Sequence, residues 1–164
     1  MSEKKQKILV LIDGHALVHR AYHALPPLIT PKGELVNAVY GFVLILMKVL
    51  KELKPDYLAA TFDLAGPTFR HKEFEDYKAT RVKAPDELYA QIGRVKDVLR
   101  AFNVPIFEKE GYEADDIIGT LSEQIKNPAF APTSPRLRRA GKQKLKTIIV
   151  TGDLDTLQLI DENT

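Results

Sequence analysis

Three short apolar runs in this chain each end in aspartate, and this pattern restricts the fold more than any other feature of the sequence. The runs are residues 8–13, 57–63 and 147–153. Short apolar runs that alternate with helical patterns are typical of parallel strands buried on both faces. Because the carboxyl ends of parallel strands meet at one edge of a sheet, we expect Asp13, Asp63 and Asp153 to lie on the same edge.

The segments between these runs have the apolar periodicity of helices. It predicts helices over residues 16–22, 37–53, 85–102 and 113–125, a short strand over 104–107 and a short helix from Leu154. Alternating strands and helices indicate an α/β fold, a mostly parallel sheet with helices on both faces. The chain has 164 residues, 45% of them hydrophobic, which is enough for one core, so we expect a single domain over residues 1–164.

An acidic triplet, Glu113, Asp115 and Asp116, opens one of the predicted helices. Each acid has a purely structural alternative, because a carboxylate at a helix start accepts hydrogen bonds from free amide groups and Asp13 followed by glycine can form a turn. One carboxylate suffices for a helix start, however, and two carboxylates about 4 Å apart repel by roughly 4 kcal/mol at an effective dielectric constant near 20. Six acids together therefore indicate a site for a pair of divalent cations such as Mg²⁺, in an enzyme that acts on a phosphorylated substrate.

The composition restricts the kind of ion and the cellular compartment. The chain contains no cysteine, so any ion must be bound by oxygen or imidazole, which favours hard cations. The apolar stretch after the basic N-terminus is too short for a signal peptide or a membrane span, so we expect a cytoplasmic protein without membrane contact. A formal net charge of +2 neither requires nor excludes a polyanionic partner.

The segment 153–157 partly resembles the Asp-x-Asp-x-Thr signature of haloacid-dehalogenase-like phosphatases, in which the first aspartate is a nucleophile. The threonine falls one position early here, and those phosphatases need a long stretch after the motif, whereas nine residues follow Asp155. The spacing therefore argues against this interpretation.

Cations and aromatic residues alternate over residues 69–81, shortly after Asp63. Aromatic faces stack on unpaired bases and cations bind phosphates, so nucleic acid is the expected ligand. The alternative is a solvated amphipathic segment with Phe69 and Phe74 in the core.

Eight motifs together resemble the N-terminal 5'-3' exonuclease domain of bacterial DNA polymerase I, a relative of the flap endonucleases. They lie at residues 11–14, 20–22, 37–42, 62–63, 69–70, 77–81, 113–121 and 151–153. The resemblance implies a Rossmann-like (PIN-like) fold and cleavage of DNA at 5' flaps, nicks and branches with two Mg²⁺ or Mn²⁺ ions, in DNA replication and repair. It also implies these metal-site acids: Asp13, Asp63, Glu113, Asp115, Asp116, Asp153 and Asp155.

The same resemblance implies roles for basic and aromatic residues. Lys78 and Arg81 would contact the scissile phosphate and act with Asp115 and Asp116 in catalysis, and Tyr77 would stack on a base near the cut. The remaining DNA-binding residues would be Arg20 and Arg70. In the expected two-metal mechanism, one ion lowers the pKa of a water and the other stabilises the leaving oxygen.

The resemblance leaves two alternative functions open. Family members usually continue with two further aspartates and a helical segment that grips duplex DNA, and we expect this segment to be absent here. The chain would then be a remnant that binds branched DNA without cutting it. The other alternative is a PIN-type ribonuclease, which generally lacks the 77–81 segment. In each case we expect a monomer.

Residues 127–146 differ in composition from the rest of the chain. Three prolines are followed by six cations, which predicts a mobile basic insertion. The cations either bind DNA phosphates or lie on a solvated loop, and the loop is the favoured interpretation.

Overall fold

Parallel strands form the centre of the molecule. The computed structural model describes residues 6–74, 84–126 and 145–164. Within these ranges four strands form one sheet in the order β3-β2-β1-β4, and every neighbouring pair is parallel. The strands are β1 (Lys7–Asp13), β2 (Tyr57–Thr61), β3 (Ile106–Phe107) and β4 (Leu145–Val150). The predicted parallel sheet is therefore confirmed.

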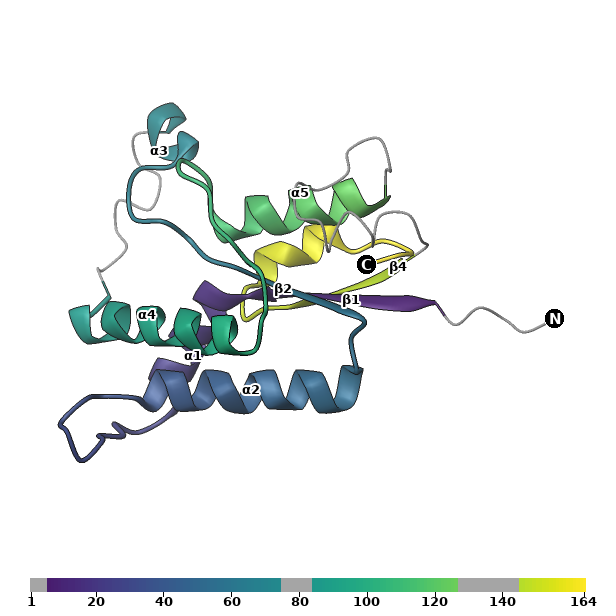
Figure 1. Ribbon diagram of the computed structural model, residues 1–164. Helices are drawn as coiled ribbons and strands as arrows, with labels where there is room; N and C mark the ends of the chain where they lie inside the picture. The colour runs from purple at the N-terminus through teal and green to yellow at the C-terminus, as the bar shows by residue number, and fades with distance from the viewer. Residues whose placement is uncertain (1–5, 75–83, 127–144) are drawn as a thin grey trace.

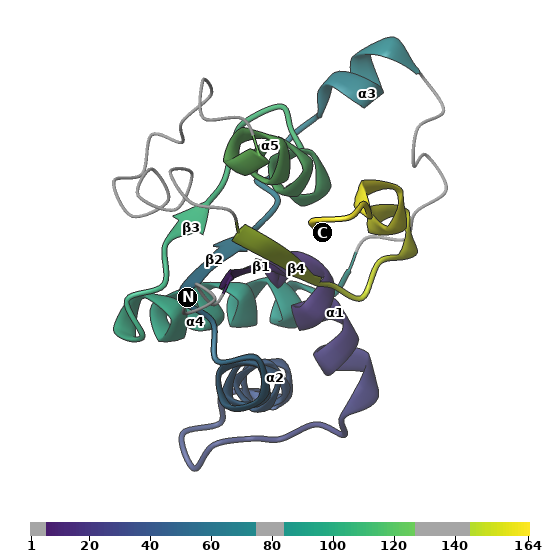
Figure 2. The ribbon, with the colours of Figure 1, turned by 90° about the vertical axis from the view of Figure 1, so that its right-hand side faces the viewer.

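Helices cover both faces of this sheet (Figure 1, Figure 2). One face is covered by α1 (Gly14–Ala24), α2 (Asn37–Leu53) and α4 (Asp86–Ala101), and the other by α5 (Ala114–Lys126). The 3-10 helix η2 (Leu154–Leu159) packs beside α5 on the second face, where Leu159 contacts the core. The short helix α3 (Phe69–Glu73) lies outside these layers. None of the helices in the described ranges combines the length and apolar character needed to cross a bilayer.

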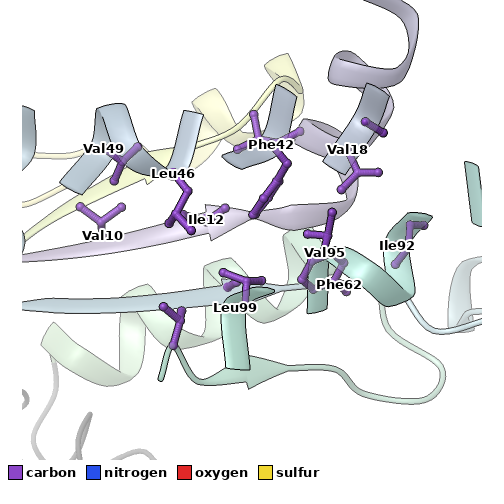
Figure 3. Packing of buried hydrophobic residues seen from close by; sticks show 14 of the residues in the cluster. Val10, Ile12, Val18, Phe42, Leu46, Val49, Phe62, Ile92, Val95 and Leu99 are labelled. Carbon is purple, nitrogen blue, oxygen red and sulfur yellow. The ribbon is translucent and has the colours of Figure 1, made fainter. Parts of the chain in front are cut away.

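The apolar sequence of β1 follows from its position between the two helix layers. Val10 and Ile12 pack into the core formed with α1, α2 and α4 (Figure 3). Leu9 and Leu11 point to the opposite face and pack with α5. Because both faces are buried, β1 reads as an uninterrupted apolar run without the usual alternation of polar residues.

A buried amide pair joins the three helices of the larger layer. Val36 provides no side-chain cap for α2, and Gln91 from α4 takes this role, since its Oε1 accepts the N–H of Ala38 over 2.8 Å. Gln91 Nε2 donates to Asn37 Oδ1 over 3.1 Å, and Asn37 Nδ2 donates to the carbonyl of Tyr22 at 3.0 Å. The ends of α1 and α2 are thereby fixed to α4.

Several element boundaries differ from the prediction. β4 begins at Leu145, two residues before the predicted start, because the buried Leu145 packs with α5. Leu145 and Lys146 therefore belong to the sheet, and the rest of the predicted basic insertion, 127–144, lies outside the described residues. The predicted strand 104–107 is shortened to β3, and α3 was not predicted.

Candidate active site

The order of the strands brings distant acids to one edge. The chain proceeds from β1 to β2 and β3 in one direction and returns to β4 on the other side of β1, so the order reverses next to β1. Asp13 ends β1 in register with Thr61, the last residue of β2. Asp63 follows β2 by two residues and Asp153 follows β4 by three. Ligands of open parallel sheets bind at such a reversal, beyond the carboxyl ends of the strands.

A pocket of about 380 Å³ lies at this edge and is called the acidic pocket below. Its carboxylates come from the end of β1, the loops after β2 and β4, and the start of α5. They are Asp13, Asp63, Glu113, Asp115 and Asp153. The fold thus brings together five of the seven acids that the sequence assigns to a metal site.

Asp13 is almost fully buried, with 2% of its surface exposed. Its Oδ1 accepts the N–H of Ala16 over 3.0 Å, and its Oδ2 accepts the hydroxyl of Thr151 over 2.7 Å. Burial raises the pKa of Asp13, and the two hydrogen bonds oppose this effect. Asp13 therefore caps α1, where its structural alternative predicts a turn, and also lines the acidic pocket.

Asp63 connects the end of β2 to the start of α5. Its Oδ1 accepts the N–H of Ala114, the first residue of α5, over 2.6 Å. Its Oδ2 lies 3.7 Å from His15 Nε2 on α1. This carboxylate is therefore oriented by groups from both helix layers.

Asp115 has the most perturbed carboxyl group of the acidic pocket. Burial and then repulsion from the other four acids raise its pKa to about 7; these acids are Asp13, Asp153, Asp63 and Glu113. Without a counter-charge, a large fraction of Asp115 therefore carries a proton near neutral pH. A divalent cation in the pocket would offset the repulsion between the carboxylates and so oppose this shift.

The donor atoms of the acidic pocket fit a hard divalent cation. Five carboxylates provide oxygen ligands of the kind that Mg²⁺ and Mn²⁺ prefer. Among the residues that the structure describes, no three acidic or histidine side chains lie close enough to enclose one ion in their present positions. Asp13 and Asp63 accept the hydrogen bonds given above, which fix the orientation of their carboxylates.

Two of the predicted metal-site acids do not line the acidic pocket. Both carboxylate oxygens of Asp116 bind Arg70, at 2.8 Å from Nη1 and 2.7 Å from Nη2. Asp155 begins η2 with Leu154, and its backbone N–H donates to Asp153 Oδ1 over 3.0 Å. The metal-site roles of Asp116 and Asp155 stay predictions.

The predicted DNA-binding residues have different surroundings. Arg20 on α1 lines the acidic pocket, whereas Arg70 pairs with Asp116. The three remaining residues, Tyr77, Lys78 and Arg81, lie outside the described residues. Phe69 and Phe74 are 36% and 64% exposed, so the alternative that places them in the core is wrong.

Three histidines on α1 also line the acidic pocket, and they were not predicted from the sequence. His15 and His19 have ring centroids 4.9 Å apart, and His19 and His23 have centroids 6.4 Å apart. Residues four apart share one face of a helix. The four-residue spacing directly after Asp13 is therefore the signal that identifies them.

Comparison with known proteins finds relatives that match nearly the whole sequence. A family model described as the 5'-3' exonuclease N-terminal resolvase-like domain matches residues 8–164. DNA polymerase I of Caldicellulosiruptor bescii is 46% identical over 155 residues, which are 94% of this chain and 16% of that protein. A 5'-3' exonuclease of Aquifex aeolicus is 40% identical over 157 residues, which are 96% of this chain and 49% of that protein. The chain thus spans about half or less of these relatives.

Solved structures show the same fold. A T5 5'-exonuclease with bound zinc has a TM-score of 0.65 at 19% identity, over 96% of this chain and 53% of that one. A T5 flap endonuclease in a complex with DNA and metal ions has a TM-score of 0.63 at 18% identity, with the same coverage. These likenesses confirm the expected fold. Since the family model covers nearly all of the sequence, the chain belongs to the family of 5'-3' exonuclease N-terminal resolvase-like domains.

Proposed function

We propose that this chain hydrolyses phosphodiester bonds of DNA at 5' ends, nicks and 5' flaps, with Mg²⁺ or Mn²⁺ as cofactor, in replication and repair. The observation that carries the proposal is the convergence of five carboxylates, from four separate segments, on one pocket. The relatives support it, because they include a 5'-3' exonuclease and DNA polymerases I. The location in the cytoplasm and the monomeric state stay predictions.

The acidic pocket would hold the ions through the five acids that line it, with Asp116 and Asp155 as predicted additions. Two divalent ions in such a site stabilise the negative charge that develops during phosphodiester hydrolysis. The chain's own groups orient the ligands: Ala114 N–H fixes Asp63, and Thr151 fixes Asp13. Burial and the repulsion from the neighbouring acids raise the pKa of Asp115 to about 7, and a cation that offsets the repulsion would favour its carboxylate form at neutral pH.

The basic residues would bind the phosphate backbone. Arg20 lies on the wall of the acidic pocket, where its guanidinium can pair with a phosphate that enters the pocket. Lys78 and Arg81 would offset the charge of the scissile phosphate, and Tyr77 would stack on a neighbouring base. The products would carry 5' phosphates.

The test is cleavage of an end-labelled 5'-flap DNA with Mg²⁺ or Mn²⁺. We expect the chain to release a 5'-phosphorylated product and Asp115→Asn to be at least about 100-fold slower. The matched control is Asp97→Asn, since Asp97 is 64% exposed on α4, and we expect no change. Absence of cleavage contradicts the proposal, and binding of flaps without cleavage supports a DNA-binding remnant. Faster cleavage of single-stranded RNA supports a ribonuclease.

A further inference from the structure

An ion pair between α3 and α5 lies beside the acidic pocket without lining it. Arg70 binds both oxygens of Asp116, at 2.8 Å and 2.7 Å. The two side chains are only 28% and 18% exposed. Bidentate pairs of this kind fix the orientation of both partners, and partial burial limits screening by salt.

Asp116 also organises the start of α5. Its Oδ2 accepts the N–H of Glu113 over 2.9 Å, and Arg70 Nη1 lies 3.5 Å from Glu113 Oε2. The next residues in this turn are Ala114, whose N–H orients Asp63, and Asp115, which lines the acidic pocket. The pair therefore supports the turn from which the pocket acids project.

Further contacts fix Arg70 against this turn. The N–H of Phe69 donates to the carbonyl of Gly111 over 3.0 Å. The Arg70 guanidinium lies 4.6 Å from the centroid of the Phe69 ring, which in turn lies 5.7 Å from that of Tyr112. Figures 1 and 2 show α3 apart from the helix layers and next to the loop that precedes α5.

We propose that Arg70 and Asp116 are positioning residues that set the first turn of α5 and thereby place Glu113, Asp115 and Asp63 around the acidic pocket. This role differs from the expected DNA contact of Arg70 and from the expected metal-site role of Asp116, because the guanidinium and the carboxylate already bind each other. The inference rests on the proposed nuclease function. It makes the two residues one functional unit, so removal of either partner has the same consequence as removal of both.

The test uses Arg70→Gln, Asp116→Asn, the double variant and Arg70→Lys. Arg94→Gln is the matched control, because Arg94 forms an exposed ion pair with Glu34 over 2.6 Å. Three quantities are measured for each: kcat and KM on flap DNA, metal-free DNA affinity in EDTA at several salt concentrations, and Tm. The metal-free affinity separates a DNA contact from a residue that acts through the pocket.

We expect Arg70→Gln and Asp116→Asn each to lower kcat at least about tenfold while the metal-free Kd changes less than about twofold. The slope of log K against log salt should stay unchanged, because no phosphate contact is lost. The double variant should be no worse than the more impaired single variant. Arg70→Lys should recover only part of kcat, since an ammonium cannot form the bidentate pair, and Arg94→Gln should match the wild type.

Two results would overturn the proposal. The first is a loss of metal-free DNA affinity of fivefold or more in Arg70→Gln with a salt slope reduced by about one, which identifies a phosphate contact. The second is a double variant whose kcat loss is the product of the single losses. If the wild-type chain cleaves nothing, the proposed nuclease function fails. The salt slope and the Tm values then still test whether Arg70 and Asp116 act as one unit. Tm losses of the single variants that add up in the double variant would refute this coupling.

Discussion

Thr151 donates its hydroxyl to Asp13 Oδ2 over 2.7 Å, although the two residues are 138 positions apart in the sequence. This hydrogen bond joins the end of β1 to the loop after β4, across the point where the strand order reverses. The carboxylate that it reaches is almost completely buried, so its hydrogen bonds replace water that the site excludes.

Thr151→Val removes this donor, and with it the acceptor of the Asp153 N–H, and keeps the shape of the side chain. We expect a loss of about 2 kcal/mol in the free energy of unfolding, because the buried Asp13 carboxylate loses one of its donors. Denaturant titration at neutral pH measures the loss. Thr151→Ser is the control, since it keeps the hydroxyl, and equal losses in both variants would contradict the interpretation.

The raised pKa of Asp115 predicts how stability depends on pH. Its folded-state pKa, about 7, exceeds the ordinary value of 3.8, so the folded state binds this proton more tightly than the unfolded state. The resulting stabilisation is fully present below about pH 4 and is lost as the pH rises through about 7. In EDTA, the Tm of the wild type should therefore fall relative to that of Asp115→Asn as the pH rises from about 4 to 8. A Tm difference between the wild type and Asp115→Asn that does not change with pH would contradict the raised pKa of Asp115.

The parts of the fold that follow from local sequence were predictable. The predicted bounds of α2 match the structure, because a long apolar helix stops where Lys54 takes a left-handed conformation before a proline. The shared edge of Asp13, Asp63 and Asp153 also follows from the strand pattern, since parallel strands end together.

Other parts depend on contacts between distant segments and could not be predicted. α3 has five residues and no buried side chain, so its helix depends on capping at Thr68 and contacts with the loop before α5. Asp115 and Asp116 are neighbours in α5 and therefore do not share a helix face. The partner of Asp116 is Arg70, 46 residues away, and the spacing of the acidic triplet does not reveal this pairing.

Gly14 allows the close packing behind Asp13. A Cβ atom at this position would lie 2.3 Å from the ring of Phe62, which is fully buried. We expect Gly14→Ala to destabilise the fold by about 1–3 kcal/mol, since the ring or α1 must move. The control is Gly93→Ala in α4, where a Cβ meets no atom within 4 Å and a gain of about 0.5–1 kcal/mol is expected. Denaturant unfolding measures both changes in the free energy of unfolding. Changes of the same sign in Gly14→Ala and Gly93→Ala would contradict the packing argument.

Gln91 stabilises the start of α2 from a neighbouring helix. Gln91→Leu keeps the size of the side chain but removes the acceptor for the Ala38 N–H and the donor to Asn37. We expect a loss of about 2–3 kcal/mol in the free energy of unfolding, together with faster hydrogen exchange in the first turn of α2. A loss below about 0.5 kcal/mol would show that water or backbone replaces the cap.

Titration of the metal-free chain with Mn²⁺, followed by electron paramagnetic resonance, tests most directly whether the gathered carboxylates form a cation site. We predict two bound ions per chain, with affinity at least about tenfold weaker in Asp115→Asn and unchanged in the surface control Asp97→Asn. Free Mn²⁺ throughout the titration, or binding that Asp115→Asn leaves intact, would contradict the assignment of the acidic pocket as the metal site.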